Sequence, residues 1–193
     1  MSETRTPLTD LSPAARHAEV TDGFTRRVLG VGAGGWDAPA PVEGWVARDV
    51  VRHLVTWFPG FLEGGTGIRL PAGPPVDEDP GAAWLAQRDA VQALLDDPAS
   101  EARVLANPHI GDVPLPQAVD RFYTSDVFLH TWDLARATGQ DETLDEGMCR
   151  MMLEGMRPMD EVLRSSGQYG PRVDVPPDAP VQDQLLGFIG RRP

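Results

Sequence analysis

The chain has 193 residues, of which 41% are hydrophobic and 24% are charged, and its formal net charge at pH 7 is -12. Its length and apolar content suffice for a sizeable core, so we expect residues 1–193 to form a single domain. The negative charge argues against binding to nucleic acid or to anionic membranes, because both depend on clustered Lys and Arg. No apolar run approaches the roughly 20 residues of a membrane span.

The start of the sequence and its cysteine content indicate a compartment. The first residues lack the apolar core of a secretion signal, so a cytoplasmic location is expected. Cys149 is the only cysteine, which excludes an intramolecular disulfide and a four-cysteine zinc site. Because Cys149 lies in the helical run 148–156, we predict a small buried hydrophobe rather than a nucleophile.

The first half of the chain predicts three helices. Ser12 and Pro13 have the residue types of an N-cap and a first helical position, so the first helix covers 13–29 and ends in the glycines of 30–35. A second helix covers 46–58 and is stopped or kinked by Pro59-Gly60. A loop rich in Gly and Pro spans 64–80, and a third helix covers 80–95.

The second half predicts a short hairpin and further helices. Residues 100–116 have the pattern of a hairpin, with apolar runs at 104–105 and 113–115. The longest helix covers 115–137, and Gly139 is its C-cap. A fifth helix covers 142–165 with a kink at Pro158, and 181–189 forms a short helix or strand. The fold class is therefore all-α, a helical bundle in which cofactor sites are built from side chains on facing helices.

Three residues are candidate metal ligands. Asp126 and His130 are four residues apart in a helical pattern, so both side chains project from one face and can share an ion. His53 lies in the apolar stripe of another predicted helix. Two imidazoles and a carboxylate suffice to hold a divalent ion between two packed helices. The alternative for each histidine is a core residue with one hydrogen-bond partner.

Other side chains are candidates for a pocket around the ion. Asp133 is a candidate catalytic group, either as a ligand or as an acceptor for an imidazole N–H; a surface charge is the alternative. Tyr123 is a second catalytic candidate. The aromatic residues expected to bind a cofactor are Trp57, Phe122 and Trp132, with the 64–80 loop at the rim of the pocket. For Tyr123 and Trp132 core packing is an equal alternative.

Several polar residues have simpler interpretations. His17 and His109 are expected to be surface or capping histidines rather than a fourth ligand. Arg48 and Asp49 fit the charge pattern at the start of a helix, so a structural role is favoured over a catalytic one.

Two blocks of sequence resemble a known family. The segment 36–54, which includes His53, and the segment Asp126-Val-Phe-Leu-His130-Thr-Trp132-Asp133 resemble actinobacterial metal-binding proteins of the DinB-like superfamily. The closest similarity is to the branch with the metal-binding domain of mycothiol-dependent maleylpyruvate isomerase. This resemblance implies a four-helix bundle and a divalent ion, commonly zinc or nickel, held by His53, Asp126 and His130. The acid of the isomerase is usually Glu, so the shorter Asp126 leaves the identity of the metal open.

Three protein ligands predict an open ion, because structural zinc is normally closed by four. Such an ion can lower the pKa of a bound water for hydrolysis, or bind a thiol as thiolate. The resemblance favours the thiolate, with mycothiol as cosubstrate. We therefore expect a transferase or isomerase that acts on a small electrophilic substrate, with a homodimer as a possible assembly. The alternatives are a hydrolase that uses metal-activated water and a metal-binding module without catalysis.

Overall fold

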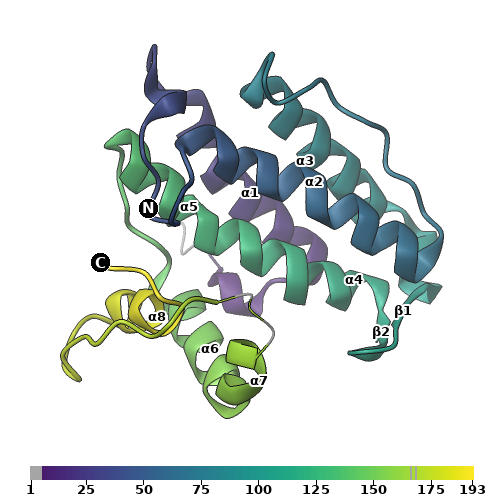
Figure 1. The fold of residues 1–193 in the computed structure, drawn as a ribbon. Coiled ribbons are helices and arrows are strands. Elements are labelled where there is room, and N and C mark those ends of the chain that lie inside the picture. Colours follow the sequence, from purple (N-terminus) through teal and green to yellow (C-terminus); the bar gives the residue numbers. More distant parts are fainter. Residues whose placement is uncertain (1–5, 166, 168) are drawn as a thin grey trace, which may run out of the picture. The chain divides into compact units, whose positions relative to one another are not determined.

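The computed structural model describes residues 6–165, 167 and 169–193 (Figure 1). By the density of contacts the chain divides into two compact units. One is Leu11–Glu142, and the other comprises residues 6–10 together with Thr143–Pro193. The prediction of one domain stays a prediction, and each unit is described by itself.

Four helices form the frame of the Leu11–Glu142 unit. They are α1 (Pro13–Leu29), α2 (Ala47–Thr66), α3 (Pro80–Asp96) and α5 (Ser125–Thr138). Helices α1 and α2 each pack against both α3 and α5. The side chains that fill the space between them are apolar and fully buried, among them Phe24, Leu54, Phe58, Trp84, Val127 and Leu134.

Capping residues set the limits of α1, α3 and α5. The Ser12 hydroxyl accepts a hydrogen bond from the N–H of Ala15, and α1 ends before Gly30, as predicted. Asp79 caps α3 in the same way, through the N–H of Ala82. Helix α5 ends at Gly139, whose φ of 67° lies in the left-handed region that favours glycine.

Helix α2 passes through Pro59 and ends only at Thr66, so of the two predicted effects of this proline, a stop or a kink, the stop is wrong. A proline inside a helix removes one backbone hydrogen bond. The apolar stripe of α2 continues beyond it, because Phe58 and Leu62 are both fully buried. Burial of each such side chain is worth about 1.5–3 kcal/mol, which offsets the lost bond. The following loop therefore starts at Gly67 rather than at residue 64.

The hairpin and the long helix that follows it have the predicted order. After the 3-10 turn Pro98–Ala102, strands β1 (Val104–Asn107) and β2 (Gly111–Pro114) pair antiparallel. The chain then continues as α4 (Leu115–Ala118), a π-helical segment (Val119–Thr124) and α5. The sequence pattern did not indicate this π segment, in which each turn holds more residues than in an α-helix.

The second unit consists of short helices. They are the 3-10 turn Leu8–Asp10, α6 (Glu146–Met156), the 3-10 turn Arg157–Met159, α7 (Asp160–Ser165) and α8 (Val181–Phe188). Pro158 interrupts the predicted long helix as expected, and Asp145 caps α6 through the N–H of Met148. Helix α8 resolves the choice between helix and strand at 181–189, and it packs against α6. Cys149 is fully buried, in agreement with its predicted role.

The described residues are mostly helical, with one two-stranded sheet, which confirms the all-α class. A search of these residues for a helix both long enough and apolar enough to cross a bilayer found none.

Candidate metal centre

Two histidines and one aspartate meet between α2 and α5. His53 comes from α2, while Asp126 and His130 come from one face of α5. One ligand atom from each residue lies within 4.8 Å of the other two. His53 Nε2 is 3.0 Å from Asp126 Oδ2, and His130 Nε2 is 3.5 Å from Asp126 Oδ1. The structure thus brings together the three residues that the spacing singled out; we call them the metal group.

The metal group is partly exposed to solvent. The side chain of His130 is 7% exposed, that of Asp126 is 23% exposed and that of His53 is 32% exposed. Solvent therefore reaches the group mainly at His53 and Asp126.

The ring of His130 is held by a buried carboxylate. Asp133 Oδ2 lies 2.8 Å from His130 Nδ1, and Asp133 is 1% exposed. An ionised carboxylate can only accept, so Nδ1 carries the proton and donates it. In the neutral imidazole, the form that binds a metal, the lone pair is then on Nε2, the nitrogen that faces Asp126. This geometry agrees with the interpretation of Asp133 as an acceptor for an imidazole N–H.

The surroundings of Asp126 keep it ionised. Burial by itself raises the pKa of this carboxyl group, but the neighbouring His130 and the hydrogen bond with His53 lower it more. The indole N–H of Trp57 adds to this effect by donating to Asp126 Oδ2 over 2.9 Å. The net pKa of Asp126 lies below its ordinary value, so the group is ionised at neutral pH, the form in which a carboxylate binds a metal.

The donor set fits a divalent transition metal. Imidazole nitrogens and a carboxylate oxygen are ligands that zinc and nickel accept in proteins. Converging donors with two partners that orient them, Asp133 and Trp57, are the arrangement expected around such an ion.

The sequence did not single out Trp45 as a site residue. Its ring stacks on that of His130, with centroids 5.8 Å apart and planes at 18°, and it lies 5.2 Å from the ring of His53. Trp45 precedes α2, so no helical spacing relates it to His53. Its place within the 36–54 block that resembled the family was the only signal in the sequence.

The part of the chain that holds the metal group matches a known protein family. The model of the mycothiol maleylpyruvate isomerase N-terminal domain family matches residues 17–135, which include the whole metal group. The chain belongs to this family. The resemblance inferred from the two sequence blocks is thereby confirmed, and the domain is of the DinB-like type.

Two relatives from Mycobacterium tuberculosis match over nearly their whole length. They are the uncharacterized proteins MT0763 of strain CDC 1551 and Rv0738 of strain H37Rv. Each is 29% identical over 184 residues, which cover 94% of this chain and 98% of the relative. No solved structure matches the chain.

Within this family domain, the three aromatic residues expected at the cofactor have different positions. Trp57 contacts Asp126 directly. Phe122 is further out, since its ring contacts Phe61, which in turn contacts Trp57. Trp132 is buried on α5, two residues from His130, and the Arg136 guanidinium covers its ring. A two-residue step points to another side of a helix.

Tyr123 and His17 both lie in the interior. Tyr123 is fully buried, with its ring stacked on Phe58 at 4.2 Å, and burial raises the pKa of its hydroxyl group. Core packing, the alternative weighed for Tyr123, describes this position. The expectation of a surface His17 is wrong: it is fully buried, and its Nδ1 is 2.8 Å from Thr124 Oγ1. His109 is exposed, as expected.

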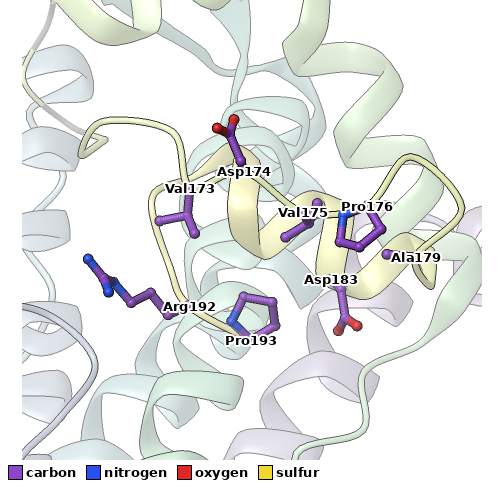
Figure 2. A pocket seen from close by; sticks show the side chains of 8 residues that line it. All are labelled: Val173, Asp174, Val175, Pro176, Ala179, Asp183, Arg192 and Pro193. Atoms are coloured by element: carbon purple, nitrogen blue, oxygen red, sulfur yellow. The ribbon is translucent and has the colours of Figure 1, made fainter.

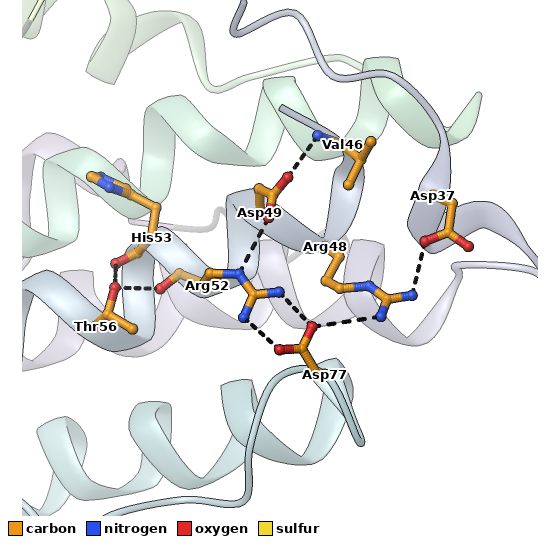
Figure 3. Close-up of polar contacts among 8 residues, drawn as sticks. All are labelled: Asp37, Val46, Arg48, Asp49, Arg52, His53, Thr56 and Asp77. Atoms are coloured by element: carbon orange, nitrogen blue, oxygen red, sulfur yellow. Dashed lines mark hydrogen bonds and ion pairs between the residues drawn. The ribbon is translucent and has the colours of Figure 1, made fainter. Parts of the chain in front are cut away.

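The loop after α2 is tied to the helix next to the metal group. Arg52 donates to both oxygens of Asp77, over 2.7 and 3.1 Å, and Arg48 donates to Asp37 (Figure 3). Asp49 accepts from the N–H of Val46 at the start of α2, which is the structural role predicted for it. The hydrogen bond from Arg52 lowers the pKa of Asp77. This loop is thus fastened one residue away from His53.

A separate cavity of about 420 Å³ lies in the Thr143–Pro193 unit (Figure 2). Its lining is mostly apolar, with two acids and one arginine: Val173, Asp174, Val175, Pro176, Ala179, Asp183, Arg192 and Pro193. None of these residues was a sequence-based candidate.

Proposed function

We propose that this protein is a metal-dependent enzyme that activates a low-molecular-weight thiol, of the mycothiol type, for transfer to a small electrophile or for its isomerisation. The observation that supports this most is the partly exposed three-residue metal group. Three protein donors leave room for a further ligand, as in catalytic rather than structural sites. The family match supports the thiol as the partner.

Each residue of the site has a defined task in this proposal. His53, Asp126 and His130 hold the ion, zinc or nickel, while Asp133 keeps His130 in the tautomer with a free Nε2. A bound ion would act as a Lewis acid and favour the thiolate form of a thiol at neutral pH. Trp45 and Trp57 offer partly exposed aromatic faces beside the group for the organic part of the ligands. Reduced thiols are abundant in the cytoplasm, where we place the protein.

The proposal includes the architecture of the DinB-like class. The mutual packing of α1, α2, α3 and α5 supports a four-helix bundle, with the ligands on its second and fourth helices.

Metal content is the first test. Protein purified without a polyhistidine tag is expected to contain one divalent ion per chain, or to take one up on reconstitution. His130→Ala should lose the ion and keep its helical circular dichroism, because interhelical packing supplies most of the stability. His109→Ala, on the exposed turn of the hairpin, is the matched control. A wild-type protein that refuses both zinc and nickel would contradict the proposal.

Activity separates the three candidate functions. We expect metal-dependent consumption of a thiol-reactive aryl halide only when mycothiol is present. Metal-dependent turnover of an activated ester without thiol would indicate the hydrolase instead. Metal binding with neither activity would indicate a module without catalysis.

A further inference from the structure

The two oxygens of the Asp126 carboxylate have different surroundings. Oδ2 accepts a hydrogen bond from the indole N–H of Trp57 over 2.9 Å and lies 3.0 Å from His53 Nε2. Oδ1 faces His130 Nε2 at 3.5 Å. A carboxylate has about four lone-pair sites, so the indole takes up one of them, and the others remain for the histidines or for an ion.

The indole is a donor with a fixed position. Trp57 follows His53 by one turn of α2, so the donor and the histidine point from the same face toward α5. Its ring is packed against those of Phe58, Phe61 and Tyr123, at centroid distances of 5.6, 5.7 and 6.0 Å. Tyr123 and Phe58 are fully buried, so Trp57 rests on the rigid interior of the unit.

We propose that Trp57 is a positioning residue for the metal group. Its N–H holds the Asp126 carboxylate in the orientation that presents a metal-binding oxygen between the two histidines. The inference depends on the proposed metal site. It goes further, because it assigns to Trp57 a hydrogen-bonding task in addition to the aromatic face that it offers to a ligand. Outer partners of this kind typically change metal affinity by about 10–100-fold when they are removed.

The test compares two Trp→Phe variants by direct zinc titration against a chromophoric chelator. Trp57→Phe keeps an aromatic ring in the cluster and removes the donor. The matched control is Trp84→Phe, because the indole of buried Trp84 also donates over 2.9 Å to a side-chain oxygen, that of Thr25. This control removes the same kind of bond within the same unit, away from the metal group.

We expect Trp57→Phe to bind zinc about 10–100-fold more weakly than wild type, while Trp84→Phe stays within about twofold. Should Trp57→Phe fail to fold, benzothienylalanine at position 57 keeps the bicyclic shape and lacks the N–H. Thermal denaturation of the metal-free proteins records the loss of stability of each variant separately from the dissociation constant.

The outcomes distinguish this inference from the metal site itself. If wild type binds zinc and the position-57 variant binds it equally well, the positioning role is overturned and the site stands. An equal loss of affinity in both Trp→Phe variants would also overturn it, since a general weakening of the fold explains that result. If wild type binds neither zinc nor nickel, the proposed metal site fails and the inference fails with it.

Discussion

The two histidines of the metal group each provide an imidazole, but their surroundings differ. His130 is nearly buried, and its Nδ1 is bound to Asp133, whereas a third of the His53 side chain is exposed. A ligand that is buried and hydrogen-bonded has little freedom left to lose when it binds an ion. His130 and Asp133 therefore form the preorganised half of the site.

Replacement of Asp133 tests this division. In Asp133→Asn the neutral amide is a weaker acceptor for the Nδ1–H of His130, and its NH₂ group can turn toward Nδ1 and favour the wrong tautomer. We expect zinc to bind about 10–100-fold more weakly, with little change in helical content. Isothermal titration of the metal-free protein measures the affinity. An unchanged dissociation constant would show that Asp133 serves only the fold.

His17 makes the stability of the fold depend on pH. Burial lowers the pKa of His17 from 6.5 to about 4, against an opposing effect of Asp96. Between these values the unfolded chain binds a proton that the folded chain does not, so the stabilisation is present above pH 6.5 and is lost as the pH falls toward 4. The shift corresponds to about 3 kcal/mol at the acid end of this range.

Comparison with a variant isolates this effect from other titrating groups. Urea denaturation of wild type and His17→Gln is measured from pH 7.5 to 4. We expect the difference in unfolding free energy between the two proteins to shrink as the pH falls, because glutamine does not titrate. A difference that is constant over this range would contradict the assignment.

At the scale of elements, local sequence signals determined where several helices begin or end, whereas packing determined that α2 continues through Pro59. The starts of α1 and α3 and the end of α5 follow from Ser12, Asp79 and Gly139, and such caps act within a few residues of sequence. The passage of α2 through Pro59 depends on the burial of Leu62 against other elements. The spacing of the apolar residues of α2 shows that the stripe can continue, but it does not show that their burial outweighs the bond lost at the proline.

Contact between α2 and the hairpin depends on one glycine. A Cβ atom at Gly65 would lie 2.7 Å from Leu105 Cγ and 3.2 Å from the backbone oxygen of Ala106. The backbone oxygen of Ala106 cannot move away as the end of a flexible side chain can. Gly65→Ala should therefore lower the unfolding free energy by about 1–3 kcal/mol. Gly64→Ala is the matched control, since no atom lies within 4 Å of its added Cβ.

The control variant is expected to be neutral or more stable by up to about 1 kcal/mol, because alanine favours helix more than glycine does. Chemical denaturation of both variants measures their unfolding free energies. Equal stabilities of the two variants would refute the close approach of α2 and β1.

At the scale of the whole molecule, all proposed site residues belong to the Leu11–Glu142 unit. The family match at 17–135 falls inside the same unit. A ligand slows local opening in the segments that hold it. We expect zinc to slow amide hydrogen exchange in α2 and α5, and to leave exchange by local opening in Thr143–Pro193 unchanged. His130→Ala should show neither effect, and a response confined to Thr143–Pro193 would place the metal elsewhere.

The sequence predicted the metal group better than its surroundings. Asp126 and His130 share a helix face by spacing, His53 was indicated by its place in the apolar stripe of another helix, and the family resemblance pointed to the same three residues. The contact of Trp45 with His130 and the burial of His17 depend on how separate elements pack. Local spacing in the sequence does not indicate such packing. The π segment was missed for the same reason, because its residue types are those of an ordinary helix.

That π segment limits how the gene for this protein can change in length. A π-helical turn is equivalent to one residue inserted into an α-helix. Loss of a single codon within Val119–Thr124 would restore an α-helix and rotate α5 relative to α4 by about 100°, the angle of one residue. Asp126 and His130 would then turn away from His53. An in-frame deletion would therefore separate the ligands while the helix itself remained intact.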